Sequence, residues 1–522
     1  MRVYVICQGA SLKVFDKLIK CLSKHIDVEM VSYYVSGSSF YKKYTNHSHN
    51  IQINGEILKG WDVVRKGLKR RPSSEEIKNW EKKLRIPSLW PAVVADRRMI
   101  YGKDCKVRQD YKSRYSLSKL QGITIELLES LWSSFETTRP EIILSFSPAT
   151  VGAQIAELVA KAQGIPTLNL KSMKISNYVT LSEDFYERHN HIRSRYLDYL
   201  NKTILNDEVS KAALGYLASA KMKSAVYEGS LIPQKDSLHK LIIRLLIGFP
   251  KAIIRDLIFS MSAEKHDPHY QRRVQSLWHG GLGKRLKIYR AKQFLSPITL
   301  SHSELLNTPY VFFPFNSEPE IALSVYSRFT LNQIEVIRNI SQSVSLGTLV
   351  VVKEHPRSWG LRSMGYYRRL SEIPNVRIVP VETPTNEVIR HAKATIVISS
   401  FVGFESVLQG VPVVALGNCS YDMLPKTMVC TIKCYDDLPE TLQYMSINYK
   451  MDEQALLSYV SAVIHESIPI DLYTRMLGKR GRQLGTNSSN MSSIEQQYEG
   501  MALYFKRRFD NVSKIVFSNK KI

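Results

Sequence analysis

Two short polar motifs in the second half of the chain carry the residues best suited to chemistry. Each follows directly on an apolar run, at residues 349–352 and 395–398. The candidate donor-binding residues are Lys353, His355 and Pro356 in the first motif and Ser399, Ser400, Gly403 and Glu405 in the second. Ammonium, imidazole and hydroxyl groups can donate hydrogen bonds to phosphate oxygens. The two motifs therefore predict a site for a phosphorylated ligand.

Other residues of these motifs suit the rest of a nucleotide. Glu405 would lie one turn inside a helix that begins near Val402, and its two oxygens could accept a ribose hydroxyl pair. The free backbone N–H groups and the dipole at that helix start would face the same place. Gly403 allows close backbone approach, and Pro356 keeps its loop from continuing the ladder. The structural alternative is that these are ordinary loop and helix-start residues.

A parallel sheet is needed to bring the two motifs together. Short β-branched runs such as 349–352 and 395–398 are typical of strands buried on both faces, and a third run follows at 411–416. Ligands of open parallel sheets bind at the carboxyl ends of the strands. The first two strands are expected to be adjacent or one strand apart. Lys353 and Glu354 alternate in direction, so one of them is expected to face the ligand.

The first half of the chain has its own strand–helix–strand pattern, at residues 3–7, 15–22 and 28–34. A chain of 522 residues is too long for one ordinary core. We therefore expect two α/β domains. The predicted divisions are 1–300 with a basic, amphipathic insertion, 301–435 as the ligand-binding domain, and 436–522 as a C-terminal helical segment.

Acidic residues at 177–188 supply the candidates for a general base. Glu183 and Asp184 are the two that we single out, with Glu187 nearby. The alternative is a helix N-terminus, in which Ser182 caps a first turn that carries these acids.

The net charge of +25 favours an anionic partner. The basic residues are spread along the chain without a Lys/Arg block, which argues against a nucleic-acid partner. Residues 239–261 are predicted to form two short basic amphipathic helices that lie on an anionic membrane surface, or else a helical hairpin packed on the domain. No run is long enough to predict a transmembrane helix, and residues 1–7 are too short for a signal-peptide core. Six cysteines in a chain of this length suggest reduced thiols in a cytoplasm.

The string Lys353-Glu354-His355-Pro356 followed by Ile398-Ser399-Ser400 resembles the paired HP and SS motifs of bacterial CMP-sugar transferases of the GT-B fold, which include sialyltransferases and capsular Kdo transferases. The longer string is similar to capsule polysaccharide biosynthesis proteins. It adds Pro314-Phe315, Pro319-Glu320, Gly403-Phe404-Glu405, Gly410 to Val413, and Gly417. The resemblance implies that His355 contacts the nucleotide, Ser399 and Ser400 the phosphate, and Glu405 the ribose. It also implies two Rossmann-like domains that face each other across a cleft.

The resemblance implies a glycosyltransferase that uses a nucleotide-activated sugar, with CMP favoured over UDP or GDP. Its acceptor would be a glycan or glycolipid of a capsule or other surface polysaccharide, at the cytoplasmic face of the membrane. No cofactor and no metal are expected, because the sequence offers no clear Asp-x-Asp loop. The acidic-acidic-glycine motif of the sialyltransferases finds no good match. Two alternatives stay open: an enzyme like the UDP-sugar 2-epimerases, and a non-catalytic, membrane-associated partner of a capsule assembly complex.

Overall fold

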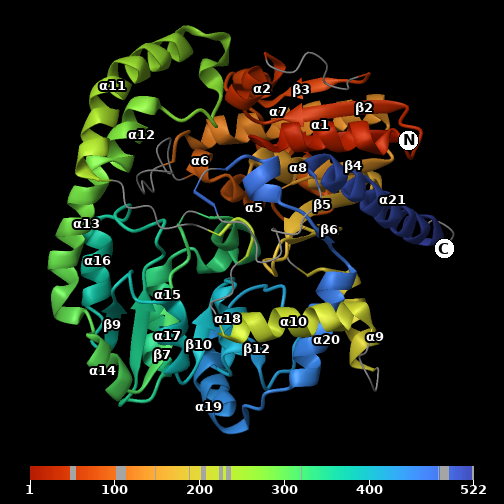
Figure 1. The fold of residues 1–522 in the computed structure, drawn as a ribbon. Helices are drawn as coiled ribbons and strands as arrows, with labels where there is room; N and C mark the ends of the chain where they lie inside the picture. The colour runs from red at the N-terminus through yellow and green to blue at the C-terminus, as the bar shows by residue number, and fades with distance from the viewer. Residues whose placement is uncertain are drawn as a thin grey trace.

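The computed structural model describes residues 1–46, 54–100, 113–146, 148–186, 188–201, 207–222, 227–230, 237–318, 320–479, 481–482 and 493–519. Two α/β domains make up the molecule, and Figure 1 shows the first above the second. Each domain is built on its own sheet with helices on both faces. This confirms the predicted fold class, two Rossmann-like domains of the GT-B kind with C-terminal helices. Glu187 and Pro319 lie outside the described residues.

A seven-stranded sheet forms the centre of the first domain, in the order β13-β6-β5-β4-β1-β2-β3. Its strands are β1 (Arg2–Cys7), β2 (Met30–Val35), β3 (Ile57–Lys59), β4 (Ile142–Ser145), β5 (Thr167–Ser172), β6 (Tyr178–Ser182) and β13 (Ile468–Pro469). The neighbouring strands β5, β4, β1, β2 and β3 are parallel to one another. Strand β6 pairs antiparallel with both β5 and β13. The strands predicted at 3–7 and 28–34 are confirmed.

Helices cover both faces of this sheet. One face packs against α1 (Ser11–Leu22) and α21 (Ile494–Asn519), with α2 (Ser38–Thr45) beside them. The other packs against α3 (Gly60–Gly67), α5 (Trp90–Ala95), α7 (Leu117–Thr138) and α8 (Val151–Gln163), with α4 (Ser74–Lys83) and α6 (Arg97–Ile100) at its margin. Local sequence sets both ends of helix α8. The Thr150 side chain accepts from the Ala153 N–H at its start, and Gly164, with a φ of 70°, ends it.

A six-stranded, all-parallel sheet forms the centre of the second domain, in the order β12-β11-β10-β7-β8-β9. Its strands are β7 (Tyr310–Pro314), β8 (Leu349–Lys353), β9 (Val376–Val379), β10 (Thr395–Val397), β11 (Val413–Ala415) and β12 (Val429–Thr431). All three predicted motif strands are present. Their β-branched residues are buried because helices cover both faces.

The helices of the second domain come from distant parts of the chain. One face of the sheet packs against α13 (Leu282–Leu295), α15 (Gln333–Ser343), α16 (Met364–Ser371) and α19 (Leu438–Asn448). The other packs against α18 (Val402–Leu408), α20 (Glu453–His465), α9 (Asn190–Leu200) and α10 (Glu208–Met222). Helices α14 (His302–Asn307) and α17 (Thr385–Arg390) contribute to a smaller cluster.

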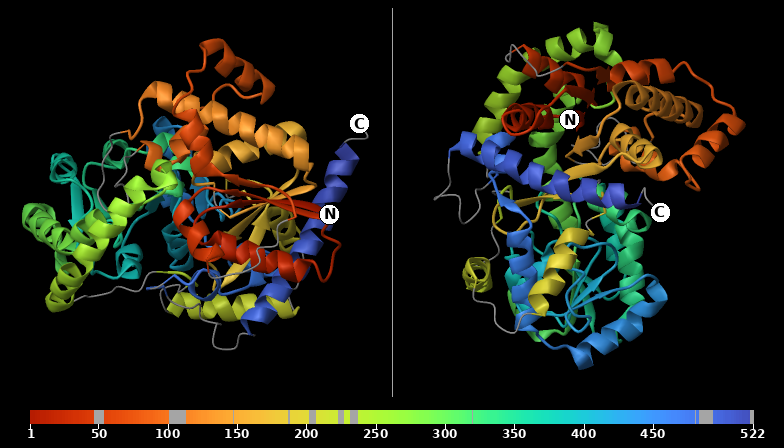
Figure 2. Two further views of the ribbon diagram at one scale, coloured as in Figure 1. Left: turned by 90° about the horizontal axis from the view of Figure 1, so that it is seen from above. Right: turned by 90° about the vertical axis from the view of Figure 1, so that its right-hand side faces the viewer.

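The chain crosses between the domains more often than its sequence divisions imply. Helices α9 and α10 belong to the first 300 residues but pack against α20 of the second domain. After α20, strand β13 joins the first sheet and α21 packs against α1, as the blue helix in Figure 2 shows. The ranges 1–300, 301–435 and 436–522 stay a prediction of how the chain divides, and these crossings must be added to it.

Residues 238–295 form a helical arm along one edge of the molecule in Figure 1. The prediction of two short helices at 239–261 is wrong, because α11 (Leu238–Met261) is one helix with Pro250 inside it. Helix α12 (Arg273–Gly280) packs against α11, and the Asp256 carboxylate accepts from the Tyr270 hydroxyl and the Arg273 N–H. Among the described residues, no helix combines the length and apolarity needed to cross a membrane.

Candidate functional site

The two predicted motifs lie at the same edge of the second sheet. Strands β8 and β10 are both hydrogen-bonded to β7, which separates them, so they are one strand apart. All three strands are parallel, and both motifs therefore begin at the carboxyl edge. Strands about 4.8 Å apart place the two strand ends about 10 Å from each other. One phosphate with its sugar can span this distance.

The His355 ring is held in one tautomer by its own loop. Its Nδ1 accepts a hydrogen bond of 3.1 Å from the Arg357 backbone N–H, so the ring proton is on Nε2. Burial lowers the pKa of His355, although the nearby Glu320 and Glu354 carboxylates act against this shift. A neutral imidazole with its Nε2–H available is a hydrogen-bond donor to a ligand oxygen.

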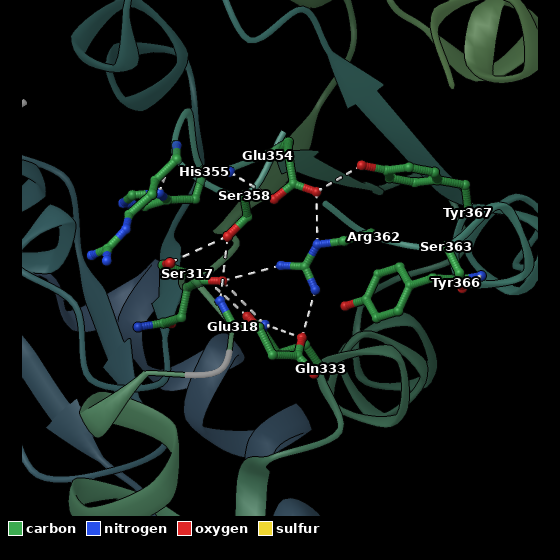
Figure 3. A network of polar contacts seen from close by, with 12 residues as sticks. Ser317, Glu318, Gln333, Glu354, His355, Ser358, Arg362, Ser363, Tyr366 and Tyr367 are labelled. Atoms are coloured by element: carbon green, nitrogen blue, oxygen red, sulfur yellow. Dashed lines mark hydrogen bonds and ion pairs between the residues drawn. The ribbon is translucent and has the colours of Figure 1, made fainter. Parts of the chain in front are cut away.

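Glu354 points away from the ligand edge, into a buried ion network. Its Oε2 accepts from the Arg362 Nε at 2.7 Å and from the Tyr367 hydroxyl at 3.2 Å. Arg362 is fully buried, and its Nη1 also pairs with Glu318 Oε2 at 2.5 Å. Figure 3 shows this network beneath the His355 loop. Of the alternating pair Lys353 and Glu354, the lysine is therefore the one left for the ligand edge.

The network joins the two loops that follow β7 and β8. The Glu354 Oε1 accepts the His355 backbone N–H at 2.9 Å, and Gln333 Nε2 donates to Glu318 Oε2 at 2.9 Å. Arg362 was missed by the sequence analysis. In the sequence Arg362 is one charged residue in a loop without a motif. Its partners Glu354 and Glu318 lie 8 and 44 residues away, so no local pattern indicates the network. The network positions His355 and Arg357 without contacting a ligand itself.

Glu405 lies in the first turn of α18, where one charge from each domain faces it. Burial raises the pKa of Glu405 to about 7, while Lys174 of the first domain and Lys353 favour its ionised form. Burial also lowers the pKa of Lys353, and the carboxylates of Glu382 and Glu405 oppose that shift. Glu405 therefore changes its charge near neutral pH.

The two serines differ in what their hydroxyls can still do. Ser399 Oγ donates its only proton to the Asn418 carbonyl at 2.6 Å, because a carbonyl can only accept. Ser400 Oγ accepts from the Val402 N–H at 3.3 Å and keeps its own proton available. Ser400 is therefore the serine that can donate to a phosphate without breaking an existing bond.

Gly403 is required by a contact within the protein. A Cβ at this position would lie 2.0 Å from the Tyr421 hydroxyl, which donates to the Ser400 carbonyl at 2.5 Å. The close approach that we predicted for Gly403 is therefore made by Tyr421. Pro356 lies exposed at the turn of its loop.

The first domain brings basic and aromatic residues to this edge. The Lys171 ammonium lies 5.2 Å from the Tyr326 ring centroid, and the Lys174 ammonium lies 5.9 Å from that of Phe401. The rings of Tyr227 and Phe401 meet edge to face at 5.7 Å. Lys174 has a φ of 58°, in the left-handed region, within the β5–β6 hairpin. The sequence analysis missed this lysine because only the tertiary fold places it beside Glu405.

The structure does not bring Glu183 and Asp184 to this edge. Strand β6 runs antiparallel to β5, so its end lies beside Thr167 at the start of β5, about 16 Å from the carboxyl end of that strand. Glu183 pairs with Arg508 at 2.7 Å, and Asp184 accepts the Tyr186 N–H. The alternative of a helix start is also wrong, because Ser182 ends a strand. Both carboxylates therefore lie away from the motif loops, and a role as general base stays a prediction.

One family model matches the chain. It is that of capsule polysaccharide biosynthesis proteins, over residues 254–428. The match covers about a third of the chain, from α11 to the residue before β12, and it includes both motif loops. Over this part, the chain is similar to capsule polysaccharide biosynthesis proteins. No curated protein matches.

Solved structures with low sequence identity align with larger parts of the chain. The β-Kdo 2,7-transferase KpsC of Thermosulfurimonas dismutans is 10% identical, with 66% of this chain and 88% of that one covered at a TM-score of 0.34. The UDP-GlcNAc 2-epimerase of Neisseria meningitidis, solved with UDP-GlcNAc, is 13% identical, with 89% and 98% covered at a TM-score of 0.27.

Proposed function

We propose that the protein is a glycosyltransferase that transfers a sugar from a nucleotide-activated donor, with a CMP-sugar favoured, to a glycan or glycolipid acceptor in capsule or other surface polysaccharide synthesis. The observation that carries this proposal is the convergence of Lys353, His355, Ser400 and Glu405 at one carboxyl edge, opposite Lys174 of the first domain. The match of the same loops to capsule polysaccharide biosynthesis proteins supports it.

In this reaction the acceptor hydroxyl releases its proton to water as its oxygen forms a bond to the anomeric carbon, and the bond from that carbon to the donor phosphate oxygen breaks. The electron pair of the broken bond stays on the phosphate. Lys353, the His355 Nε2–H and the Ser400 hydroxyl would stabilise this charge, together with the backbone N–H groups where α18 begins. Glu405 would accept the ribose hydroxyls. In this proposal these groups bind the donor, and no cofactor is required.

The reaction would take place at the inner face of the cytoplasmic membrane. This proposal is supported by an apolar side of α11 that the described residues leave uncovered. Its exposed side chains are Ile242, Ile243, Leu246, Ile247, Phe249, Ile253, Ile254, Leu257, Ile258 and Met261. Lys251 and Arg255 lie exposed on the same helix. An amphipathic helix of this composition can lie in the headgroup region of an anionic bilayer.

One assay tests the activity. The purified protein is incubated with CMP-, UDP- and GDP-sugars, with and without membrane glycolipid, and nucleotide release is followed. A transferase releases nucleotide with one donor, and the acceptor increases the rate. Conversion of the UDP-sugar without an acceptor would instead identify an epimerase. Donor binding without any turnover would make the chain a non-catalytic partner of a capsule assembly complex.

A further inference from the structure

Four basic side chains of the two domains lie together beside the donor motifs, and the donor site does not account for them. Arg97 begins α6 of the first domain, and Arg357 follows His355 in the second. Lys479 and Arg482 follow η6 (Leu472–Met476), in the segment by which the chain returns to the first domain. The side chains are close enough for Arg357 to interact electrostatically with Arg97 and Arg482, and Lys479 with all three.

The segment that carries Lys479 and Arg482 is anchored by a buried carboxylate. Glu228 is 1% exposed and accepts the backbone N–H groups of Tyr473 and Thr474. The Glu228 N–H donates in turn to the Ser176 carbonyl at 2.8 Å, which joins this segment to the β5–β6 hairpin. Three parts of the chain are therefore held together here.

Contacts with Gly229 and Tyr473 position Lys479 and Arg482. Gly229 has a φ of 86°, and the Tyr473 ring lies 2.4 Å from where its Cβ would be. The Arg482 guanidinium donates to the Gly229 carbonyl, and the Lys479 ammonium lies 4.7 Å from the Tyr473 ring centroid. These contacts hold both cations in place beside Arg357.

Arg357 and Lys479, two of the four cations, have no ion-pair partner within the described part of the chain. The Glu228 carboxylate accepts two backbone N–H groups and its charge also acts on Lys479, whereas the charge of Glu320 acts on Arg357. Burial lowers the pKa of Lys479 to about 8, and the charges of Arg482, Arg357 and Arg97 add to this effect. Arg357 and Lys479 lie exposed, so an anion in solution can reach both cations.

We propose that Arg97, Arg357, Lys479 and Arg482 form a second anion site, which binds a phosphate or carboxylate group of the acceptor. The donor phosphate already has Lys353, His355 and Ser400 at the strand ends. The second site is built mostly by residues of the first domain, and we assign it to the acceptor because the second domain binds the donor. This inference rests on the proposed function and adds to it that the acceptor is anionic.

The test uses the full chain and inorganic phosphate as the probe. Thermal unfolding is followed while sodium phosphate replaces sodium chloride at constant ionic strength, with and without saturating CMP. A ligand that binds the folded state raises the melting temperature. We expect phosphate still to raise it when CMP occupies the donor site. A parallel titration with acetate distinguishes a site for phosphate from a site for carboxylate.

Lys479→Met and Arg357→Gln should each weaken phosphate binding roughly tenfold, because each removes a charge-assisted contact. Lys393→Met is the matched control, since Lys393 is exposed on the second domain away from these side chains. Ser400→Ala should weaken CMP binding and leave intact the phosphate binding that persists at saturating CMP. Unchanged phosphate binding in both Lys479→Met and Arg357→Gln would overturn the proposal. So would loss of phosphate binding on saturation with CMP, because the site would then belong to the donor.

The two proposals can fail separately. The protein could bind phosphate in a way that depends on Lys479 and yet turn over no donor. This result would support the anion site and contradict the proposed transferase activity. In an active protein, Lys479→Met should raise the KM for the acceptor and leave the KM for the donor unchanged. An increase in the donor KM alone would contradict the acceptor assignment.

Discussion

At the scale of single residues, the types of the ligand-binding groups could be predicted, but their hydrogen bonds could not. The strand context of His355 and Glu405 follows from apolar runs in the sequence, and both lie at the predicted edge. The difference between Ser399 and Ser400 depends on Asn418, 19 residues from Ser399. The local pattern of a Ser-Ser pair contains no information about such a partner.

The different bonds of the two serines lead to a prediction about phosphate binding. Ser400→Ala should weaken binding of a nucleotide by about 1.5–3 kcal/mol, because a hydroxyl donor to a charged oxygen is lost. Ser399→Ala should cost less, since that hydroxyl donates to the Asn418 carbonyl. Calorimetric titration with CMP and with cytidine measures both effects. Equal losses for nucleotide and nucleoside would mean that Ser400 only supports its loop.

The raised pKa of Glu405 predicts that donor binding depends on pH. Above about 7 the carboxylate is ionised and can accept both ribose hydroxyls, whereas below it the group is protonated. Donor affinity should therefore rise about tenfold from about pH 6 to about pH 8. His355 does not produce this trend, because burial lowers its pKa and any protonation of its ring would strengthen phosphate binding at low pH, which is the opposite trend. Glu405→Gln should bind weakly at every pH; a profile identical to that of the wild type would exclude Glu405 as the titrating group.

At the scale of elements, the strands were predictable and the contacts between loops were not. Each buried β-branched run became a strand because helices cover both sheet faces. The loops after β7 and β8 are joined by Arg362, whose role appears only when residues distant in sequence are brought together. Helix α11 also differs from the prediction, because Pro250 lies within one continuous helix.

Arg362→Leu should destabilise the second domain strongly. It would leave the Glu354 and Glu318 carboxylates buried without their cation, which costs about 3–5 kcal/mol in the free energy of unfolding. Urea denaturation measures this cost. Arg369→Leu on α16 is the control, because Arg369 is exposed and should change stability little. If the two variants were equally stable, the network would not hold the His355 loop.

At the scale of the whole molecule, net charge and a local apolar pattern both indicated a membrane surface. The fold adds the position of that pattern, on the helical arm at the edge of the molecule (Figure 1). The return of α21 to the first domain could not be predicted from a helical pattern alone. It depends on the apolar face of α1, almost 500 residues earlier in the sequence, and such long-range pairing leaves no local signal.

Binding to anionic vesicles should depend on the exposed side of α11. Ile254→Glu with Leu257→Glu should reduce co-sedimentation, because both side chains are more than half exposed and the change places charge on the membrane-facing side. Binding should also fall as salt rises, since each Lys or Arg near the surface contributes about 1 kcal/mol that salt screens. Leu346→Glu is the control, a fully exposed leucine on the second domain. Equal pelleting of all variants with neutral and anionic vesicles would exclude this surface.

The crossings of the chain between its two sheets limit how the protein can be recombined. A donor-binding half exchanged with a related enzyme would have to bring α9 and α10 from one part of the chain and α19 and α20 from another. If only residues 301–435 were exchanged, the apolar side of α18 would pack against α9, α10 and α20 of the other parent. Donor preference in such hybrids should therefore follow the transplanted core only when all of these helices come from the same parent.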